Sequence, residues 1–157
     1  MPGAILILVV AAAAELSGGA RVVKFAGGSM WIHTEGDVDH VVVRDETGGV
    51  TAESRCDTGI FDEYEGIFTK LRDAVTRSDR KAVMNLVAYP FRVNGKKPLV
   101  FRSAASLTRK YDAVFTPEAQ ARIRKAEPAA VFCRDGRAMF GDGVVWASRT
   151  GLAVLNP

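Results

Sequence analysis

The sequence predicts an α+β domain over residues 57–157, preceded by a small β-rich segment over residues 15–56. The first observation is a change in hydrophobic periodicity at Asp57, from an alternation of period 2 to a spacing of i, i+3, i+4 and i+7. The second is the order of elements after Asp57: two helices, a short hairpin, two further helices and a series of extended segments separated by turns. This order ends in an antiparallel meander and indicates helices packed on a sheet.

Residues 4–14 form an uninterrupted run of 11 small or aliphatic side chains. A helix that spans a bilayer needs about 20 residues. The run instead has the length of a signal-peptide core, and Ala12 and Ala14 provide a cleavage site. We therefore expect residues 1–14 to be a signal peptide and the mature protein to be periplasmic or secreted. Because residues 1–3 carry no Lys or Arg, a buried N-terminal strand or helix stays open as the alternative.

The β-rich segment is predicted to contain short strands connected by Gly-rich turns. The strands are expected at residues 21–25, 30–33, 40–44 and 50–54. A hairpin is predicted around residues 45–49, because Val41 and Val43 share one face of a strand and a Gly-rich turn follows at once. No function is assigned to this segment.

The first helix of the domain is predicted to have Asp57 or Thr58 as its N-cap and to bury one apolar face. That face consists of Ile60, Phe61, Tyr64, Ile67, Phe68, Leu71, Ala74 and Val75. Ser78 is expected to cap a second helix, which ends before Pro90 because proline disfavours the α conformation at the preceding residue. A short hairpin follows, with its turn at Asn94.

Two more helices and a set of strands complete the domain. Ser103 is predicted to cap a third helix, whose apolar side carries Leu107, Tyr111, Val114 and Phe115. The fourth helix is expected to begin at Thr116, because a capping hydroxyl, a proline and an acidic residue follow one another there. The strands are expected at residues 129–134, 138–140, 144–148 and 152–155.

Charge is unevenly distributed along a chain whose net charge is +3. Residues 15–65 carry 11 acidic and 4 basic side chains, a net of −7, and residues 70–125 carry 4 acidic and 14 basic, a net of +10. This separation fits the docking of an acidic segment on a basic one, or a surface that binds a polyanion. The natural contacts for a polyanion are Arg92, Lys96, Lys97 and Arg102. No aromatic stacking platform is interleaved with them, so nucleic acid is not the expected partner.

The chain has two cysteines, Cys56 and Cys133, which are too few for a disulfide scaffold. We expect them to be either bridged or both buried. No metal-ligand spacing involves them, and the sequence contains no Walker, Gly-x-Ser-x-Gly or His-Glu-x-x-His pattern. The sequence therefore predicts neither a cofactor nor a metal site.

Three short segments carry a resemblance to a known superfamily. They are residues 86–91 (LVAYPF), 110–115 (KYDAVF) and 141–146 (GDGVVW). Together with the order of elements, they resemble exported bacterial proteins of the nuclear transport factor 2-like (cystatin-like) superfamily. The resemblance implies a long first helix across a strongly curved antiparallel sheet, and a cone that encloses a cavity. That superfamily includes ketosteroid isomerases and dehydratases as well as many noncatalytic binding modules.

The resemblance also suggests where a ligand would bind. Enzymes of the superfamily use a carboxylate or a His–Asp pair inside the cone. His33 and His40 precede the domain, so Asp112 is the best-placed acid, and Asp142 is expected to form a turn. The predicted ligand-binding residues are Tyr64, Tyr89, Tyr111, Asp112 and Trp146. Their aromatic members either line the cavity or belong to the core, and no catalytic residue is assigned.

The expected function is that of a noncatalytic exported binding or interaction module, whose partner is a small apolar ligand or a protein. The alternative is a small cavity enzyme of the isomerase or dehydratase type that acts on an apolar carbonyl compound. A carboxylate buried inside the cone would distinguish the two. No transmembrane segment is expected. Pairing through the open face of the sheet is one option for a homodimer.

Overall fold

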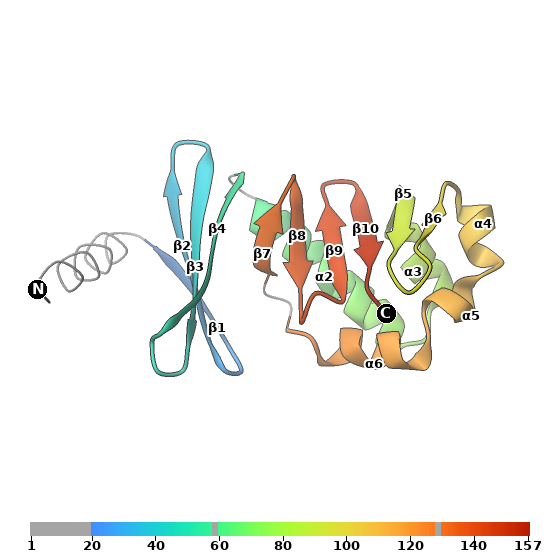
Figure 1. The fold of residues 1–157 in the computed structure, drawn as a ribbon, viewed down its shortest axis with the longest axis horizontal. Coiled ribbons are helices and arrows are strands. Elements are labelled where there is room, and N and C mark those ends of the chain that lie inside the picture. The colour runs from blue at the N-terminus through green and yellow to red at the C-terminus, as the bar shows by residue number, and fades with distance from the viewer. Residues whose placement is uncertain (1–19, 58–59, 128–129) are drawn as a thin grey trace, which may run out of the picture. The chain divides into compact units, whose positions relative to one another are not determined.

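The chain folds as two compact units that divide between Thr58 and Gly59. The computed structural model describes residues 20–57, 60–127 and 130–157. The predicted signal peptide, residues 1–14, lies outside the described residues. Each unit has its own sheet (Figure 1).

The first unit is a four-stranded antiparallel meander. Its strands are β1 (Arg21–Phe25), β2 (Gly28–Glu35), β3 (Val38–Asp45) and β4 (Val50–Asp57), paired in chain order. The register places Met30 opposite Val43 and Ile32 opposite Val41, and all four side chains are buried. Because side chains alternate between the faces of a sheet, these four form one apolar face. The hairpin predicted around residues 45–49 is confirmed, since β3 and β4 pair across it.

In the second unit, helices pack against a six-stranded sheet. The helices are α2 (Ile60–Thr76), α3 (Arg80–Asn85), α4 (Ala104–Thr108), α5 (Tyr111–Val114) and α6 (Pro117–Lys125). The strands are β5 (Val87–Val93), β6 (Leu99–Phe101), β7 (Ala130–Arg134), β8 (Arg137–Phe140), β9 (Val145–Ser148) and β10 (Gly151–Leu155). The strand order is β6-β5-β10-β9-β8-β7, and α2 crosses one face (Figure 1).

Local capping determines where the short helices begin. The Thr116 hydroxyl accepts a hydrogen bond from the backbone N–H of Ala119, with Pro117 at the start of α6, which confirms the predicted fourth helix. The cap of α3 is Asp79 and not Ser78, because the Asp79 carboxylate accepts from the Ala82 N–H at 2.9 Å. The second helix was therefore predicted correctly, but its cap was wrong by one residue.

The third helix was predicted as one element and is two. Ser103 caps α4 as predicted, accepting from the Ser106 N–H, but α4 ends after Thr108 and α5 begins at Tyr111. Leu107 and Tyr111 are buried on either side of this break. The i, i+4 spacing of apolar residues therefore predicted the buried side correctly and missed the interruption.

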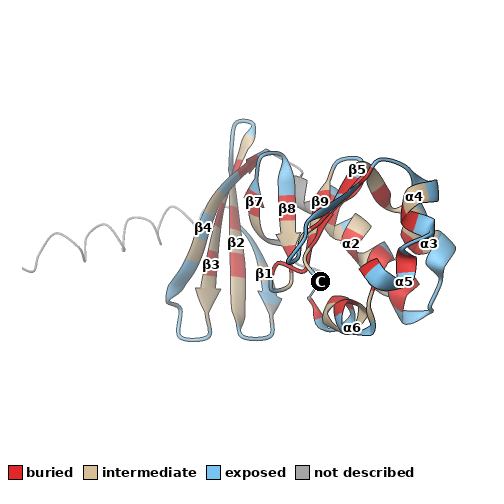
Figure 2. Ribbon diagram, turned by 45° about the vertical axis from the view of Figure 1, so that its right-hand side comes forward, coloured by how far each residue is buried: buried red, intermediate tan, exposed pale blue. Residues whose placement is uncertain are grey.

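The space between α2 and the sheet is filled with aromatic and aliphatic side chains. Phe68 lies parallel to the ring of Phe140 in β8, with 4.6 Å between the ring centroids. Tyr64, Leu71 and Val75 of α2 are also buried, so α2 has one continuous apolar face from Tyr64 onward. Figure 2 colours the ribbon by burial and shows buried segments, in red, in both the helices and the sheet of this unit.

The α+β class is confirmed, but the nuclear transport factor 2-like cone on an antiparallel sheet is wrong. The described residues are strand-rich and form two sheets, and the six-stranded sheet is mixed because β10 runs parallel to β5. The buried, stacked rings of Phe68 and Phe140 fill the space between α2 and β8, where the cone would have its interior.

The prediction for the two cysteines is confirmed. Cys56 and Cys133 are both buried and both disulfide-bonded, which leaves no free thiol. A disulfide constrains the unfolded chain and so stabilises the fold, typically by about 2 to 4 kcal/mol.

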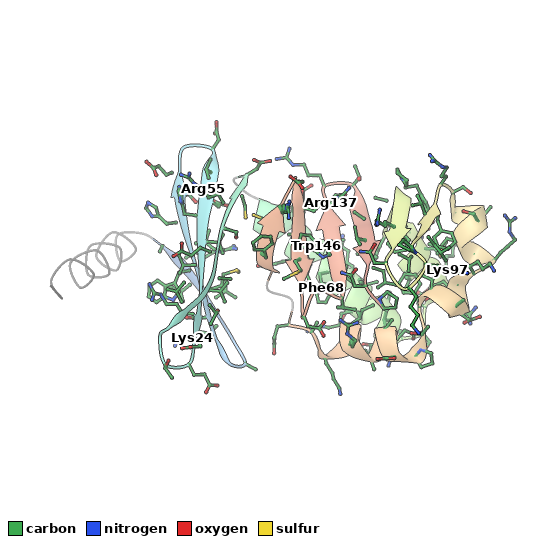
Figure 3. The ribbon with its side chains drawn as sticks, in the orientation of Figure 1. Lys24, Arg55, Phe68, Lys97, Arg137 and Trp146 are labelled. Carbon is green, nitrogen blue, oxygen red and sulfur yellow. The ribbon has the colours of Figure 1, made fainter. Side chains whose placement is uncertain are left out.

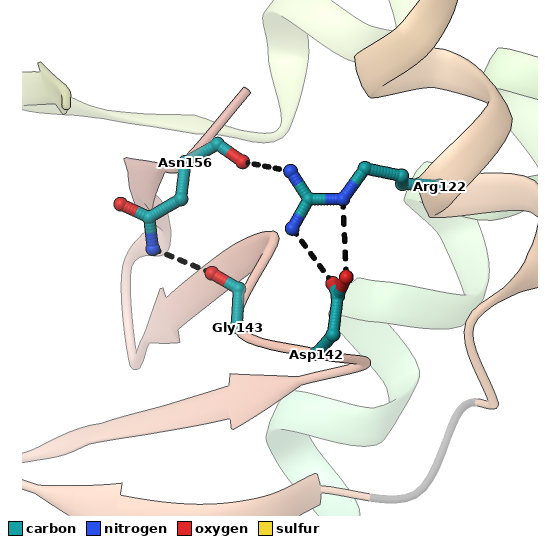
Figure 4. Close-up of polar contacts among 4 residues, drawn as sticks. All are labelled: Arg122, Asp142, Gly143 and Asn156. Carbon is teal, nitrogen blue, oxygen red and sulfur yellow. Dashed lines mark hydrogen bonds and ion pairs between the residues drawn. The ribbon is translucent and has the colours of Figure 1, made fainter. Parts of the chain in front are cut away.

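Asp142 forms a turn, as its Gly-flanked position predicted, and it also anchors α6. The Arg122 guanidinium donates to both carboxylate oxygens of Asp142, at 2.8 and 3.2 Å, and to the backbone carbonyl of Asn156 at 2.7 Å (Figure 4). Asn156 in turn donates to the carbonyl of Gly143. The hydrogen bonds from Arg122 hold the pKa of Asp142 below its ordinary value.

Replacing Asp142 with Asn is expected to lower the free energy of unfolding at pH 7 by about 1 kcal/mol, the upper end for a half-exposed ion pair. Because the pKa of Asp142 is lower in the folded state than in the unfolded state, its ionised carboxylate stabilises the folded state at pH values above the unfolded pKa of about 4. This stabilisation is lost as the pH falls through the folded-state pKa. The difference between wild type and Asp142→Asn should therefore narrow below pH 4 in urea titrations. Asp135→Asn is the control, because the Asp135 pair is longer and more exposed. A pH-independent difference would contradict this account.

Candidate functional site

One row of side chains crosses the face of the six-stranded sheet that is turned away from α2. In β9, Val145 and Ala147 are buried and Trp146 between them is half-buried. Because neighbouring residues of a strand point to opposite faces, Trp146 belongs to the outer face. The strand register continues this row in both directions. We call it the outer row, and its members are Val100, Arg92, Val154, Trp146, Met139 and Phe132.

A pocket of about 500 Å³ opens on this face around Trp146, a size within the usual range for small-molecule sites. We call it the Trp146 pocket. It is lined by Arg92, Asn94, Arg134, Asp135, Arg137, Trp146, Val154 and Asn156. Its apolar lining comes from the indole and from Val154, and its polar lining comes from three guanidinium groups, two carboxamide groups and the Asp135 carboxylate. The pocket therefore combines a flat apolar floor with hydrogen-bond donors.

A chain of side-chain hydrogen bonds fixes one wall of the Trp146 pocket. Arg92 Nε donates to Asn94 Oδ1 at 2.6 Å, and Asn94 Nδ2 donates to Asn156 Oδ1 at 2.7 Å. Asn156 Nδ2 then donates to the Gly143 carbonyl. Because Arg92 uses Nε for this contact, its two terminal nitrogens stay available to a ligand.

The opposite wall comes from the hairpin of β7 and β8. Arg134 and Arg137 face each other across its turn, and Arg137 lies one strand away from Trp146 (Figure 3). The turn residues Asp135 and Gly136 both have positive φ, which suits a tight hairpin. The Tyr64 hydroxyl donates to the Gly136 carbonyl at 2.9 Å and so ties this turn to α2.

The aromatic floor is also held in place. Phe132 of β7 packs edge-on against Trp146, with 6.1 Å between centroids and 81° between planes. Met139 of β8 is the register partner of both residues. The indole plane is therefore positioned by its neighbours in the outer row.

The five predicted ligand-binding residues do not form one site. Trp146 lines the Trp146 pocket, whereas Tyr64 is a buried member of the core. Tyr89 is half-buried in β5, where burial raises the pKa of its hydroxyl and no described group hydrogen-bonds it. Tyr111 and Asp112 lie on α5, next to α3.

Tyr111 lines a second, smaller pocket of about 290 Å³ with residues of α3 and α4. The Arg80 guanidinium lies 4.8 Å from the centre of the Tyr111 ring and forms an ion pair with Asp112. Burial raises the pKa of Tyr111, and the Arg80 charge opposes this rise. Arg80 therefore already contacts a ring and a carboxylate of its own chain, so little of its guanidinium group remains available to a ligand.

None of the acids weighed for catalysis has the setting of a general base. Asp112 is exposed and paired with Arg80, and the pKa of Asp142 is lowered by Arg122. A carboxylate that acts as a base near neutral pH needs a raised pKa in dry surroundings. His33 and His40 face each other in the first unit, and His40 is 3.6 Å from Glu35.

Sequence reasoning missed most of the Trp146 pocket. Arg92 was assigned to a surface cluster with Lys96, and Arg134 and Arg137 were not considered as site residues. A signal for the last two was present, because arginines on either side of a two-residue turn fall on the same face of a hairpin. Their closeness to Trp146 depends on pairing between strands, which no local pattern shows.

Comparison with models of protein families, with curated proteins and with solved structures returned no match for this chain. In the part of the chain that the structure describes, no helix is long and apolar enough to cross a membrane. No group of three or more His, Cys, Asp or Glu side chains in the described ranges is arranged to hold a metal ion.

Proposed function

We propose that this chain is a noncatalytic binding module whose ligand site is the Trp146 pocket. The observation that carries the proposal is a pocket of about 500 Å³ with an indole and a valine at its floor and fixed donors in its walls. Six of the eight lining residues are polar or charged, so the pocket suits a ligand that carries a polar group as well as an apolar part. The ligand is a small molecule with an apolar body.

The chemistry of the pocket favours binding over catalysis. The only carboxylate that lines it, among the described residues, is Asp135, which is exposed and lies 3.5 Å from Arg134. The guanidinium groups stay protonated at all physiological pH values and cannot take up a proton. The isomerase or dehydratase alternative needs a base in dry surroundings, and no observation favours it.

The state of the cysteines supports export of this module. Cys56 and Cys133 are disulfide-bonded, and disulfides persist mainly in oxidising compartments. This agrees with the signal peptide predicted for residues 1–14.

Fluorescence of Trp146 tests the proposal. The chain has two tryptophans, so a Trp31→Phe background makes Trp146 the only reporter. Trp31 lies in the first unit and donates to the Ser29 hydroxyl, so this change leaves the pocket intact. We expect small flat aromatic compounds such as benzoate, phenyl phosphate and benzamide to change the Trp146 emission saturably, with weak affinities that suit their size.

Two variants serve as controls in this titration. Trp146→Ala should abolish binding, which calorimetry would follow because the reporter is lost. Asp112→Asn removes the acid that the enzyme alternative would use, and we expect it to leave binding unchanged because Asp112 does not line the pocket. The proposal is refuted if compounds of all three kinds leave the Trp146 emission unchanged at millimolar concentration.

A further inference from the structure

We infer that the ligand of the Trp146 pocket carries a single carboxylate or phosphate group on a flat ring, and that Arg137 binds this anionic group. The inference rests on the proposed function and adds the chemical class of the ligand. It follows from the charges of the lining residues, the hydrogen-bond partners that they already have and the position of the indole.

The lining carries an excess of positive charge. Three arginines and one aspartate line the pocket, a net of 3 − 1 = +2. Asp135 lies 3.5 Å from Arg134, and its negative charge offsets the positive charge of that arginine. Neither Arg92 nor Arg137 forms an ion pair with any residue that the structure describes. Two guanidinium groups thus face the same pocket without a counter-charge, and an anion would stabilise them.

Arg137 is the better placed of the two for direct contact. Arg92 is engaged through Nε by Asn94, whereas Arg137 has no hydrogen bond to any described group. All five N–H donors of Arg137 are therefore available. A guanidinium with an open fork matches the two oxygens of a carboxylate or phosphate in bidentate geometry.

The ring of the ligand follows from the position of Trp146. Arg137 lies in β8 and Trp146 in the adjacent β9, and neighbouring strands are about 4.8 Å apart. Phe132 and Met139 hold the indole from one side, and Val154 extends the apolar floor on the other. A flat ring on this floor would place its anionic substituent within reach of Arg137.

Matched ligands test the charge requirement. Benzoate and benzamide have almost the same shape, and only benzoate is anionic. In the Trp31→Phe background, benzoate should bind about 10- to 100-fold more tightly than benzamide, the gain typical of a charge-assisted hydrogen-bond pair. Phenyl phosphate distinguishes the two anions, because tighter binding of phenyl phosphate than of benzoate would assign phosphate as the natural group and the reverse would assign carboxylate.

Variants of arginine test the assignment to Arg137. Arg137→Gln should weaken benzoate binding about 10- to 100-fold and leave benzamide binding unchanged. Arg137→Lys keeps the charge but not the fork, so it should recover only part of the affinity. Arg102→Gln removes the same charge outside the pocket and should change the affinity for benzoate less than twofold. Because Arg137 is exposed, thermal melting should confirm that these variants stay folded.

The outcomes separate this inference from the proposed function. Equal binding of benzoate and benzamide, or an Arg137→Gln protein with unchanged benzoate affinity, would overturn the inference and leave the pocket as a site for neutral ligands. Equal losses of benzoate affinity in Arg137→Gln and Arg102→Gln would show that benzoate responds to the positive charge of the whole surface and not to Arg137, and would also overturn the inference. A failure of all three compounds to bind would refute both proposals.

Discussion

Replacing Phe68 with alanine is expected to lower the free energy of unfolding by about 3 to 5 kcal/mol, the usual cost of removing a buried phenylalanine. Phe68 is fully buried and its ring stacks on Phe140 at 4.6 Å. The variant would leave a cavity between α2 and β8, and close-packed neighbours collapse into such a cavity only in part. Urea unfolding followed at the helical circular-dichroism signal measures the effect, because every helix in the described residues belongs to the second unit.

Phe132→Ala is the matched control, because it removes the same ring from the outer face of the same sheet. Phe132 is only half-buried and packs edge-on against Trp146, so a loss of about 1 to 2 kcal/mol is expected. Losses of equal size in the two variants, or a loss below 1 kcal/mol for Phe68→Ala, would mean that the space between α2 and the sheet is not tightly filled.

Features that depend on a few neighbouring residues could be predicted from the sequence. The change in period at Asp57 located α2, and the capping hydroxyl at Thr116 located the start of α6. The turn at residues 45–49 located the β3–β4 hairpin. In each case a local feature, namely the spacing of apolar residues, a cap or a tight turn, determines the structure.

Features that depend on pairing between distant segments could not be predicted. The parallel pairing of β5 with β10 joins Val87 to Leu152, and nothing in either segment shows that they are neighbours. The prediction of a cone was wrong for a related reason. The apolar spacing of α2 does not show whether the space between α2 and the sheet is open or filled. Phe140 from β8 fills it.

The residues of the candidate site were likewise predicted only in part. Trp146 was selected because an indole combines an apolar face with a donor, and it does line a pocket. Tyr64 was selected for the same chemistry but is buried, and its hydroxyl is used by the Gly136 carbonyl. The chemistry of a side chain is visible in the sequence, whereas its exposure is set by the register of strands and helices around it.

Replacing Gly151 with alanine is expected to lower the free energy of unfolding by roughly 3 kcal/mol or more. Gly151 has a φ of +135°, and an added Cβ would lie 2.3 Å from the backbone carbonyl oxygen of Leu86. Backbone strain of this kind costs about 1 to 3 kcal/mol, and the clash adds to it because a backbone oxygen cannot rotate away. The same oxygen accepts a hydrogen bond from the Leu152 N–H at 2.7 Å, so the clash also displaces the start of β10.

Gly136→Ala separates the two contributions to this loss. Gly136 also has a positive φ, of +69°, but nothing lies within 4 Å of an added Cβ, so only backbone strain of about 1 to 2 kcal/mol is expected there. Urea titrations of both variants give the comparison. Because β10 lies between β5 and β9 and carries Val154 of the Trp146 pocket, Gly151→Ala should also weaken ligand binding. Equal losses of stability at the two glycines would show that strain alone, and not the close approach of Leu86, determines the requirement for glycine.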